Sequence, residues 1–428
     1  MKLIGCAAAC LILTGCGVGS SADTLLSAPM ISEEQKAVCE ALKSAAGENI
    51  SLVYPKSGEY RSAFIFYDLD GDGSDEAVAF YENSEDSEGN VRVNILDSAE
   101  GQWRSVYDHA GAGTSVEQVI ISDIGGVGKT RMAIGYSYIA PTEKTLRVYS
   151  FDGNVLENEY SETYYKLLKL DLDKDGGEDI ALINSNSDIR RAYISLVTDR
   201  GEGVGSVSKV ELNENFADIP SVIGGKIGND TPALFVDGVL GSGNLNTEII
   251  YCINGQLRNP AGAAGSQISS LTVRSAGYFC RDIDGDGIVE IPSREPFPGY
   301  RETSDMQYIT NWNVFENYTI VKKYASLTEA AKGYCFMLPV RWEGLVTVKN
   351  DPATGEKVFY KYNTSLRESR LELMRVLVCA PADVASKALD GYVTAASGEN
   401  AVYMVKFGDT EDNLLLTVAE VSNNFYIY

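Results

Sequence analysis

Histidine is almost absent from this sequence, and so are the basic clusters and long apolar runs that point to several common functions. His109 is the single histidine among 428 residues, so acid–base or metal chemistry by histidine would rest on it alone. After the N-terminal segment, no apolar run approaches the roughly 18 residues of a membrane-spanning helix, and we expect none in the mature protein. The 60 acidic residues outnumber the 36 basic ones, and the net charge of −24 argues against binding to nucleic acid.

Cysteine is present but forms no recognisable pattern. Two of the eight cysteines fall within the first ten residues, and a third is Cys16. The remaining five include no CxxC pair and are odd in number, so they fit neither a disulfide framework nor a zinc site. We expect them to be buried free thiols; they are Cys39, Cys252, Cys280, Cys335 and Cys379.

The N-terminal segment has the pattern of a bacterial lipoprotein signal peptide. Residues 1–15 contain Lys2, an apolar stretch and a final Leu-Thr-Gly that leads into Cys16. We therefore expect cleavage before Cys16, lipidation of its thiol and a tether over residues 16–31. The protein would then be exported and held by its lipid at the outer face of the cell membrane. The alternative is an ordinary secretory signal with an incidental cysteine.

Three acidic nonapeptides share one pattern, with Asp at positions 1, 3 and 5, Gly at position 6 and an acidic residue at position 9. They are Asp68–Glu76, Asp171–Asp179 and Asp282–Glu290. An apolar segment that we expect to form a strand comes just before each one, at residues 63–67, 166–170 and 277–280. After the first two, another apolar segment follows. The pattern therefore predicts acidic loops between paired strands.

Two degenerate copies lie between the intact loops and complete a repeat. They begin at Asp123 and Gly224, so the five copies start at positions 68, 123, 171, 224 and 282. Short apolar runs separated by turn signals fill each interval. Four short strands in a repeat of about 50 residues are typical of a β-propeller blade. We expect a mainly β fold, a propeller-like array of five or six four-stranded blades over residues 48–330, with a sandwich or solenoid as the alternative.

The acidic loops favour calcium because alternate carboxylates in a tight turn bring several oxygen atoms to one point. A hard cation with many oxygen ligands relieves that repulsion, the glycine permits the turn, and the carbonyl of position 7 can join the shell. The loops are not EF-hands, because position 12 is Ala79, Leu182 or Ser293 and the flanks are strands. The alternative is acidic turns without metal. We expect about three structural calcium ions, with these ligands: Asp68, Asp70, Asp72, Ser74 and Glu76; Asp171, Asp173, Asp175, Gly177 and Asp179; Asp282, Asp284, Asp286, Ile288 and Glu290.

The degenerate copies carry a basic residue where the intact loops have an acid. Arg131 occupies position 9 of the second copy, and Lys226 occupies position 3 of the fourth. A side-chain cation in place of a lost metal ion would keep the local charge balanced. We therefore expect no ion in these two copies.

The DxDxDGxx[DE] nonapeptides between strands resemble FG-GAP/VCBS repeats, the calcium loops of integrin-α-type propellers. Residues 68–81, 232–237, 281–292 and 338–348 are similar to segments of VCBS-repeat lipoproteins of clostridia-type bacteria. The resemblance covers most of the mature chain and departs from the pattern in the two degenerate copies. It implies a surface-anchored propeller with calcium loops, but that group has no assigned activity.

Residues outside the repeats form two further regions. Ser32 and Gln35 make a capping-box pattern, and the apolar positions that follow predict an amphipathic helix over residues 32–47, packed on the array. Residues 331–428 read as a small α+β domain. We expect its strands at residues 345–348, 357–362, 371–379, 401–407 and 414–421, and a short helix at residues 381–389.

Two features are typical of functions that we do not assign. The glycine-rich segment Gly125–Thr130 resembles a phosphate-binding loop, but Asp123 stands where the first glycine is needed and a strand pattern follows. We expect no nucleotide. His109 precedes an Ala-Gly-Ala-Gly segment, and we expect it to be a solvated residue in a turn between blades.

Two functions remain compatible with these features. The first is a non-catalytic surface module that binds an extracellular polysaccharide, peptide or envelope protein. The second is a propeller-borne glycoside hydrolase or polysaccharide lyase that uses carboxylate and tyrosine chemistry. Acidic and aromatic residues gathered in one concave pocket, away from the metal loops, would favour the enzyme, whereas a flat or divergent face would favour binding.

Overall fold

The computed structural model describes residues 32–84, 89–138, 144–186, 191–263, 265–301 and 305–427. The expected signal peptide, the lipidation residue Cys16 and the tether lie outside this part of the chain. In the described residues, no helix combines the length and apolar character needed to cross a membrane. The chain divides into two compact units, one formed by residues 1–54 and 62–111 and the other by residues 55–61 and 112–428.

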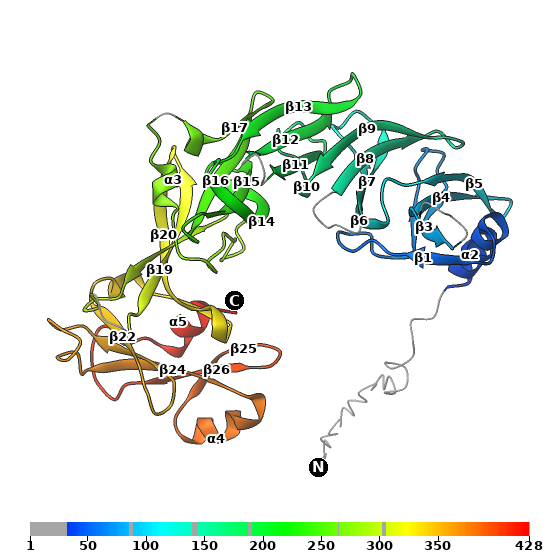
Figure 1. Ribbon diagram of the computed structural model, residues 1–428. Coiled ribbons are helices and arrows are strands. Elements are labelled where there is room, and N and C mark those ends of the chain that lie inside the picture. Colours follow the sequence, from blue (N-terminus) through cyan, green and yellow to red (C-terminus); the bar gives the residue numbers. More distant parts are fainter. Residues whose placement is uncertain are drawn as a thin grey trace, which may run out of the picture. The chain divides into compact units, whose positions relative to one another are not determined.

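The first unit is a β-sheet covered by one helix (Figure 1). Helix α2 (Glu33–Ala46) begins with the predicted capping box and buries Val38 and Leu42 in the hydrophobic core of this unit. Strands β1 and β2 pair with successive halves of β3, which continues through β4 to β5. The strands are β1 (Ile50–Val53), β2 (Phe64–Tyr67), β3 (Glu76–Asn83), β4 (Arg92–Ala99) and β5 (Gln102–Ala110).

The second unit begins with three four-stranded antiparallel sheets, each made of strands that are consecutive in the chain (Figure 1). The first contains β6 (Ser115–Asp123), β7 (Thr130–Ser137), β8 (Lys144–Phe151) and β9 (Leu156–Tyr164). The second contains β10 (Lys166–Leu170), β11 (Asp179–Asn186), β12 (Arg191–Asp199) and β13 (Val204–Glu211). The third contains β14 (Phe216–Ile227), β15 (Thr231–Leu240), β16 (Leu245–Ile253) and β17 (Gln256–Arg258).

The next sheet extends beyond the expected domain boundary at residue 330. It contains β18 (Ile291–Pro296), β19 (Tyr308–Glu316), β20 (Thr319–Glu329), β21 (Tyr334–Met337) and the C-terminal strand β27 (Phe425–Ile427). The 3₁₀ turns η1 (Pro260–Gly262) and η2 (Ala330–Lys332) and helix α3 (Ile268–Leu271) lie in its connections. Because β21 pairs with both β20 and β27, the end of the chain belongs to the same sheet as the end of the repeat region.

Residues 277–280, which we predicted as a strand before the third acidic loop, do not form one. Their hydrogen bonds are directed elsewhere: the Cys280 N–H donates to the buried carboxylate of Asp237 at 2.8 Å. The same carboxylate pairs with the buried guanidinium of Arg274 at 2.6 Å. A buried charge pair therefore ties this segment to β15 and takes the place of strand pairing.

The remaining sheet has the order β22-β23-β24-β26-β25 and confirms four of the five strands expected in this region. It contains β22 (Val346–Asn350), β23 (Lys357–Lys361), β24 (Glu372–Cys379), β25 (Val393–Ser397) and β26 (Val402–Phe407). The expected helix is present as η4 (Pro381–Asp383) and α4 (Val384–Leu389), and η3 (Val340–Trp342) precedes the sheet. The strand predicted at residues 414–421 is wrong: helix α5 (Val418–Asn423) begins there with a capping box between Thr417 and Glu420.

Consecutive sheets of the second unit share hydrophobic clusters. Side chains of β7 and β8 meet those of β11, side chains of β12 meet those of β15 and β16, and β15 also meets β18 and β19. The central strands are therefore buried on both faces, as in Ile180–Ile183 and Ala233–Val236. This explains why they are continuous apolar runs instead of alternating patterns.

Each degenerate copy is braced by hydrogen bonds against the intact loop of the following sheet. The Gly125 N–H donates to the Glu178 carbonyl at 3.0 Å, and the Lys226 N–H donates to the Gly287 carbonyl at 2.9 Å. In return, the Val289 N–H donates to the Lys226 carbonyl at 3.0 Å. The turns of neighbouring sheets are thus joined at the acidic loops.

Glycine is required where these turns meet. A Cβ atom on Gly177 would lie 2.1 Å from the Gly126 nitrogen, and one on Gly125 would lie 2.0 Å from the Asp199 carbonyl oxygen. The glycine-rich segment that resembled a phosphate loop therefore serves close backbone packing, and it is followed by strand β7.

Replacing Gly177 with alanine should push the second and third turns apart. We expect Gly177→Ala to lower the free energy of unfolding by about 1–3 kcal/mol, measured by chemical denaturation in the presence of a chelator. Gly205→Ala is the matched control, because a Cβ at Gly205 meets nothing within 4 Å, and it should change stability by less than about 0.5 kcal/mol. Equal stability of the two variants would contradict the close approach.

Candidate functional site: three acidic loops and a polar cleft

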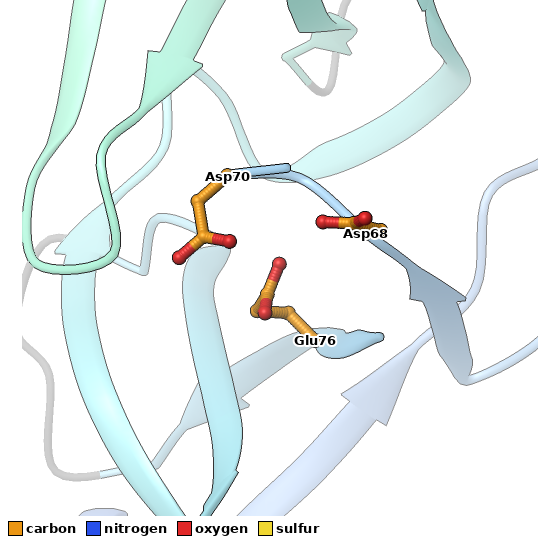
Figure 2. A group of neighbouring side chains, drawn as sticks. All are labelled: Asp68, Asp70 and Glu76. Carbon is orange, nitrogen blue, oxygen red and sulfur yellow. The ribbon is translucent and has the colours of Figure 1, made fainter. Parts of the chain in front are cut away.

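The carboxylates of positions 1, 3 and 9 come together in each intact loop. The groups are Asp68, Asp70 and Glu76; Asp171, Asp173 and Asp179; and Asp282, Asp284 and Glu290. In each group, one oxygen atom from every residue lies within 4.8 Å of the others. Figure 2 shows the first group, with two aspartates on the loop after β2 and the glutamate at the start of β3. Each group could hold a metal ion, although oxygen donors alone do not single out calcium.

Two recurring hydrogen bonds build this geometry in all three loops. The carboxylate of position 1 accepts the glycine N–H of position 6, at 3.1, 3.2 and 2.8 Å in chain order. The carboxylate of position 9 accepts the N–H of position 2, at 2.7, 3.0 and 2.9 Å. Position 9 opens the central strands β3 and β11 in the first two loops and immediately precedes the edge strand β18 in the third, and it is at most 1% exposed. The turn is therefore closed around a buried acidic group.

The aspartates of position 5 do not belong to the converging groups. Each accepts the N–H of position 7: the Ser74 N–H donates to Asp72 at 2.7 Å, the Gly177 N–H to Asp175 at 2.8 Å and the Ile288 N–H to Asp286 at 2.8 Å. These short side-chain-to-backbone bonds shape the turn. A role for positions 5 and 7 as metal ligands stays a prediction.

In the second loop, three carboxylate oxygens lack a hydrogen-bond partner. They are the Oδ1 atoms of Asp171, Asp173 and Asp179. Asp179 is fully buried, and the side chain of Asp173 is only 7% exposed. Burial raises the pKa of Asp179 to about 6, and the nearby charge of Asp173 adds to this effect. Buried acidic oxygens without partners are costly, so this group fits a bound cation well.

The first loop has a similar imbalance of charge. Burial raises the pKa of Glu76 to about 7, and the charges of Asp70 and Asp72 contribute despite the hydrogen bond from the Leu69 N–H. Among the residues that the structure describes, no lysine or arginine forms an ion pair with this group. In the second loop, by contrast, Arg200 lies 3.1 Å from Asp173.

The third loop already contacts a cation from the protein itself. The Lys323 ammonium on β20 lies 2.9 Å from Asp284, 2.6 Å from Asp286 and 2.8 Å from Glu290. The neighbouring Tyr324 hydroxyl donates to Asp284 at 2.8 Å. Burial opposes the charge of Lys323, but its three carboxylate partners raise its pKa well above the usual range. Sequence reasoning missed Lys323, because it lies 33 residues beyond Glu290 and has no local signal.

The basic residues of the degenerate copies do not replace a metal ion locally. Arg131 is 1% exposed, but its guanidinium pairs with Asp199 at 2.5 Å and with Glu159 at 2.8 Å. Asp123 keeps the turn, because it accepts the Gly128 N–H at 2.8 Å as position 1 does in the intact loops. Lys226 pairs with the exposed Asp230 at 3.0 Å. Both cations therefore serve other carboxylates.

Two further expectations have clear outcomes. All five cysteines expected to be free are free in the structure, but only Cys280 and Cys335 are buried, and the other three are partly exposed. His109 is exposed, but it lies within strand β5, opposite Val93, and not in a turn. Its neighbour Asp108 belongs to an ion pair with Arg92.

A cleft of about 970 Å³ in the second unit has no residue of the acidic loops in its lining. Its walls come from the β13–β14 connection, from β16, from β17 and η1, and from the turn between β19 and β20. Acidic and aromatic residues gather in it: Glu211, Glu214, Glu248, Tyr251 and Tyr318. Because these residues come from distant repeats, the sequence did not reveal that they share one site.

Hydrogen bonds hold the polar lining of the cleft in place. The Glu248 carboxylate is 3% exposed and accepts the Asn213 N–H at 2.9 Å. The side-chain amide of Asn215 donates to Asn213 at 3.0 Å, and that of Asn259 donates to the Glu211 carbonyl at 3.2 Å. Burial raises the pKa of Glu248. The cleft therefore presents ordered amides beside an acidic group that is protonated more readily than usual.

Comparison with known proteins gives no family assignment. No family model matches the sequence, and none of the curated proteins matches it. Among solved structures, rhamnogalacturonan lyase YesW is 11% identical, with a TM-score of 0.30 over 75% of this chain and 76% of that chain. A rhamnogalacturonan lyase of Bacillus licheniformis is 12% identical, with a TM-score of 0.28 over 73% of each chain.

A third solved structure, an exo-β-1,3-galactanase from Phanerochaete chrysosporium, is 11% identical, with a TM-score of 0.27 over 77% of this chain and 81% of that chain. Likenesses at these scores carry no argument about the activity of this chain.

Removing the Lys323 ammonium should leave the buried carboxylate of Glu290 without its counter-charge. We expect Lys323→Met to lower the free energy of unfolding in chelator by about 2–4 kcal/mol. Lys322→Met is the matched control, because Lys322 pairs with Glu343 on an exposed part of the same strand, and it should cost less than about 0.5 kcal/mol. A loss of stability of similar size in both variants would mean that Lys323 is not the counter-ion of the third loop.

Proposed function

We propose that this chain is an exported, lipid-anchored surface protein whose calcium-stabilised, propeller-like array binds an extracellular polysaccharide, peptide or envelope protein. The observation that carries the binding function is the cleft described above. It is concave, it is lined by acids, amides and tyrosines from several strands, and its polar groups are already ordered by hydrogen bonds. Pre-formed concave sites with a few fixed polar groups are typical of ligand binding. A concave cleft with acidic and aromatic residues was expected to favour an enzyme, but its most buried acid, Glu248, is almost inaccessible and already hydrogen-bonded, which favours binding over catalysis.

The proposed calcium ions occupy the first and second loops. The three unpaired oxygens of the second loop support this assignment most directly, because a hard cation would satisfy all of them. In the third loop, a metal ion would have to displace the Lys323 ammonium, which already contacts three carboxylates. We therefore infer two ions bound with higher affinity, and not the three that the loop sequences predict.

The proposed propeller-like array is supported by the regularity of the sheets. Five successive sheets, from β1–β5 to β18–β21, have strands that follow one another in chain order or nearly so. In the second unit, neighbouring sheets share hydrophobic faces and joined turns. Each sheet would then be one blade, and in the second unit the second and third acidic loops would stabilise the joints between blades.

A glycoside hydrolase is the second candidate, and Glu248 is the observation that favours it. Acids and tyrosines do gather in one concave cleft away from the metal loops, and burial raises the pKa of Glu248, as suits a general acid. Glu211 and Glu214 offer second carboxylates. Binding ranks first because Glu248 is almost completely buried and already accepts the Asn213 N–H. A calcium-dependent lyase is less favoured, because the acidic loops do not line the cleft.

Calcium should stabilise the protein in proportion to the number of acidic loops that bind an ion. We expect two ions per chain by elemental analysis after equilibrium dialysis, and a higher unfolding temperature with calcium than with chelator. At free calcium tenfold above the dissociation constant, each ion would add about 1.4 kcal/mol. Asp171→Asn should remove one ion together with its share of the stabilisation.

Asp123→Asn is the control for this experiment, because it removes the same charge from position 1 of a degenerate copy. It should leave both ions in place. Unfolding that is independent of calcium, with no ion bound, would defeat the metal assignment.

The lipid anchor depends on one atom, the Sγ of Cys16. In a bacterium that processes lipoproteins, Cys16→Ala should leave an uncleaved precursor or release the protein from the membrane fraction, as seen by fractionation and mass spectrometry. Normal processing and unchanged membrane association of the variant would rule out the lipoprotein assignment.

A further inference from the structure

An aromatic residue occupies a turn position that normally requires glycine. Strands β19 and β20 are joined by only two residues, Asn317 and Tyr318, because Glu316 pairs with Thr319 across the hairpin. Both turn residues have positive φ, 49° and 61°. Such two-residue turns favour Asn followed by Gly, because glycine has no Cβ to clash. Asn317 follows this rule, and Tyr318 breaks it at an energetic cost.

The Tyr318 side chain contacts Phe315 and lies within hydrogen-bond reach of Tyr251, but it buries little of its surface. It is 71% exposed, although a tyrosine ring is large enough to bury considerable apolar area. The ring stands edge-on to Phe315, with centroids 6.4 Å apart and planes at 87°, and Phe315 lies 6.2 Å from the buried Tyr251. The aromatic side chains behind it therefore support Tyr318 while most of its own surface stays open. Tyr318 has an unfavourable backbone conformation and an exposed aromatic ring, and a residue with both features is better explained by function than by folding.

Tyr318 lies at the cleft described above. Together the exposed ring, the ordered amides of Asn213 and Asn259 and the acids of the cleft form a surface that is apolar on one side and rich in hydrogen-bonding groups on the other. Saccharide rings have the matching shape, with an apolar C–H face and a rim of hydroxyl groups. Tyrosine contributes both a flat surface and a polar tip at little cost in side-chain entropy.

We propose that the cleft binds a neutral saccharide and that the Tyr318 ring is the platform on which a sugar ring stacks. This inference rests on the proposed binding function and names its ligand class. The charge of the cleft selects against acidic sugars: Glu211, Glu214 and Glu248 outnumber the one lining cation, Arg258. The net charge of −24 would repel a uronate polymer further at low ionic strength.

The decisive variant is Tyr318→Gly, tested on the full mature chain with calcium present. Glycine suits the turn, so the unfolding temperature should rise by about 2 °C. Binding to neutral oligosaccharides, probed with immobilised glucan, galactan, xylan and mannan fragments, should weaken at least about tenfold because stacking is lost. Tyr318→Phe keeps the ring and should bind within about threefold of the wild type.

Asp230→Gly is the matched control, because Asp230 also has positive φ in a hairpin turn but does not line the cleft. It should leave saccharide binding unchanged. Equal binding by the wild type and Tyr318→Gly, or a lower unfolding temperature of Tyr318→Gly, would overturn the role of Tyr318 while the proposed binding function stands. Binding of polygalacturonate or of peptides, but of no neutral saccharide, would overturn the ligand class alone. Failure to bind any of the immobilised glycans or peptides would overturn the proposed binding function itself.

Discussion

The buried carboxylate at position 9 of each acidic loop is the constraint on which this structure depends. Glu76 and Asp179 open central strands and Glu290 precedes the edge strand β18. Each of the three closes its turn by accepting a backbone N–H. Burying an acid at this point is costly unless a cation or a proton accompanies it. The repeats differ in what accompanies this position. The second loop has unpaired carboxylate oxygens that a cation could bind, the third loop has the Lys323 ammonium, and one degenerate copy has Arg131 in place of the acid.

These charges matter beyond their own turns because the turns of neighbouring sheets are joined. The second acidic loop exchanges backbone hydrogen bonds with the turn of the preceding sheet, and Gly177 is packed against that turn with no room for a side chain. A cation that holds one loop therefore stabilises two sheets at once. The cleft lies on other connections of the second unit, so the two acidic loops of that unit would influence a ligand through the stability of its sheets and not by contact.

The agreement between local sequence and local structure differs sharply from one part of the molecule to another. At the start of α2, capping residues and apolar spacing all favour the observed helix. In the turn of the β19–β20 hairpin, Tyr318 opposes the conformation that it adopts. Natural sequences tolerate such conflicts mainly where function requires them. The unfavourable conformation of Tyr318 is therefore stronger support for a binding role of the cleft than the volume of the cleft is.

The sequence by itself determined what depends on residues close together in the chain: the repeat, the acidic loops with their glycines, helix α2 and most of the strands. It misled where a local pattern was ambiguous, as when the capping box at Thr417 was overlooked in favour of a strand. Only the tertiary structure brought Lys323 to the third loop, joined β27 to β21 and gathered the walls of the cleft. The physical reason is that these contacts join residues tens of positions apart, for which local backbone preferences give no signal. The hydrophobic packing of whole sheets decides which of these residues meet.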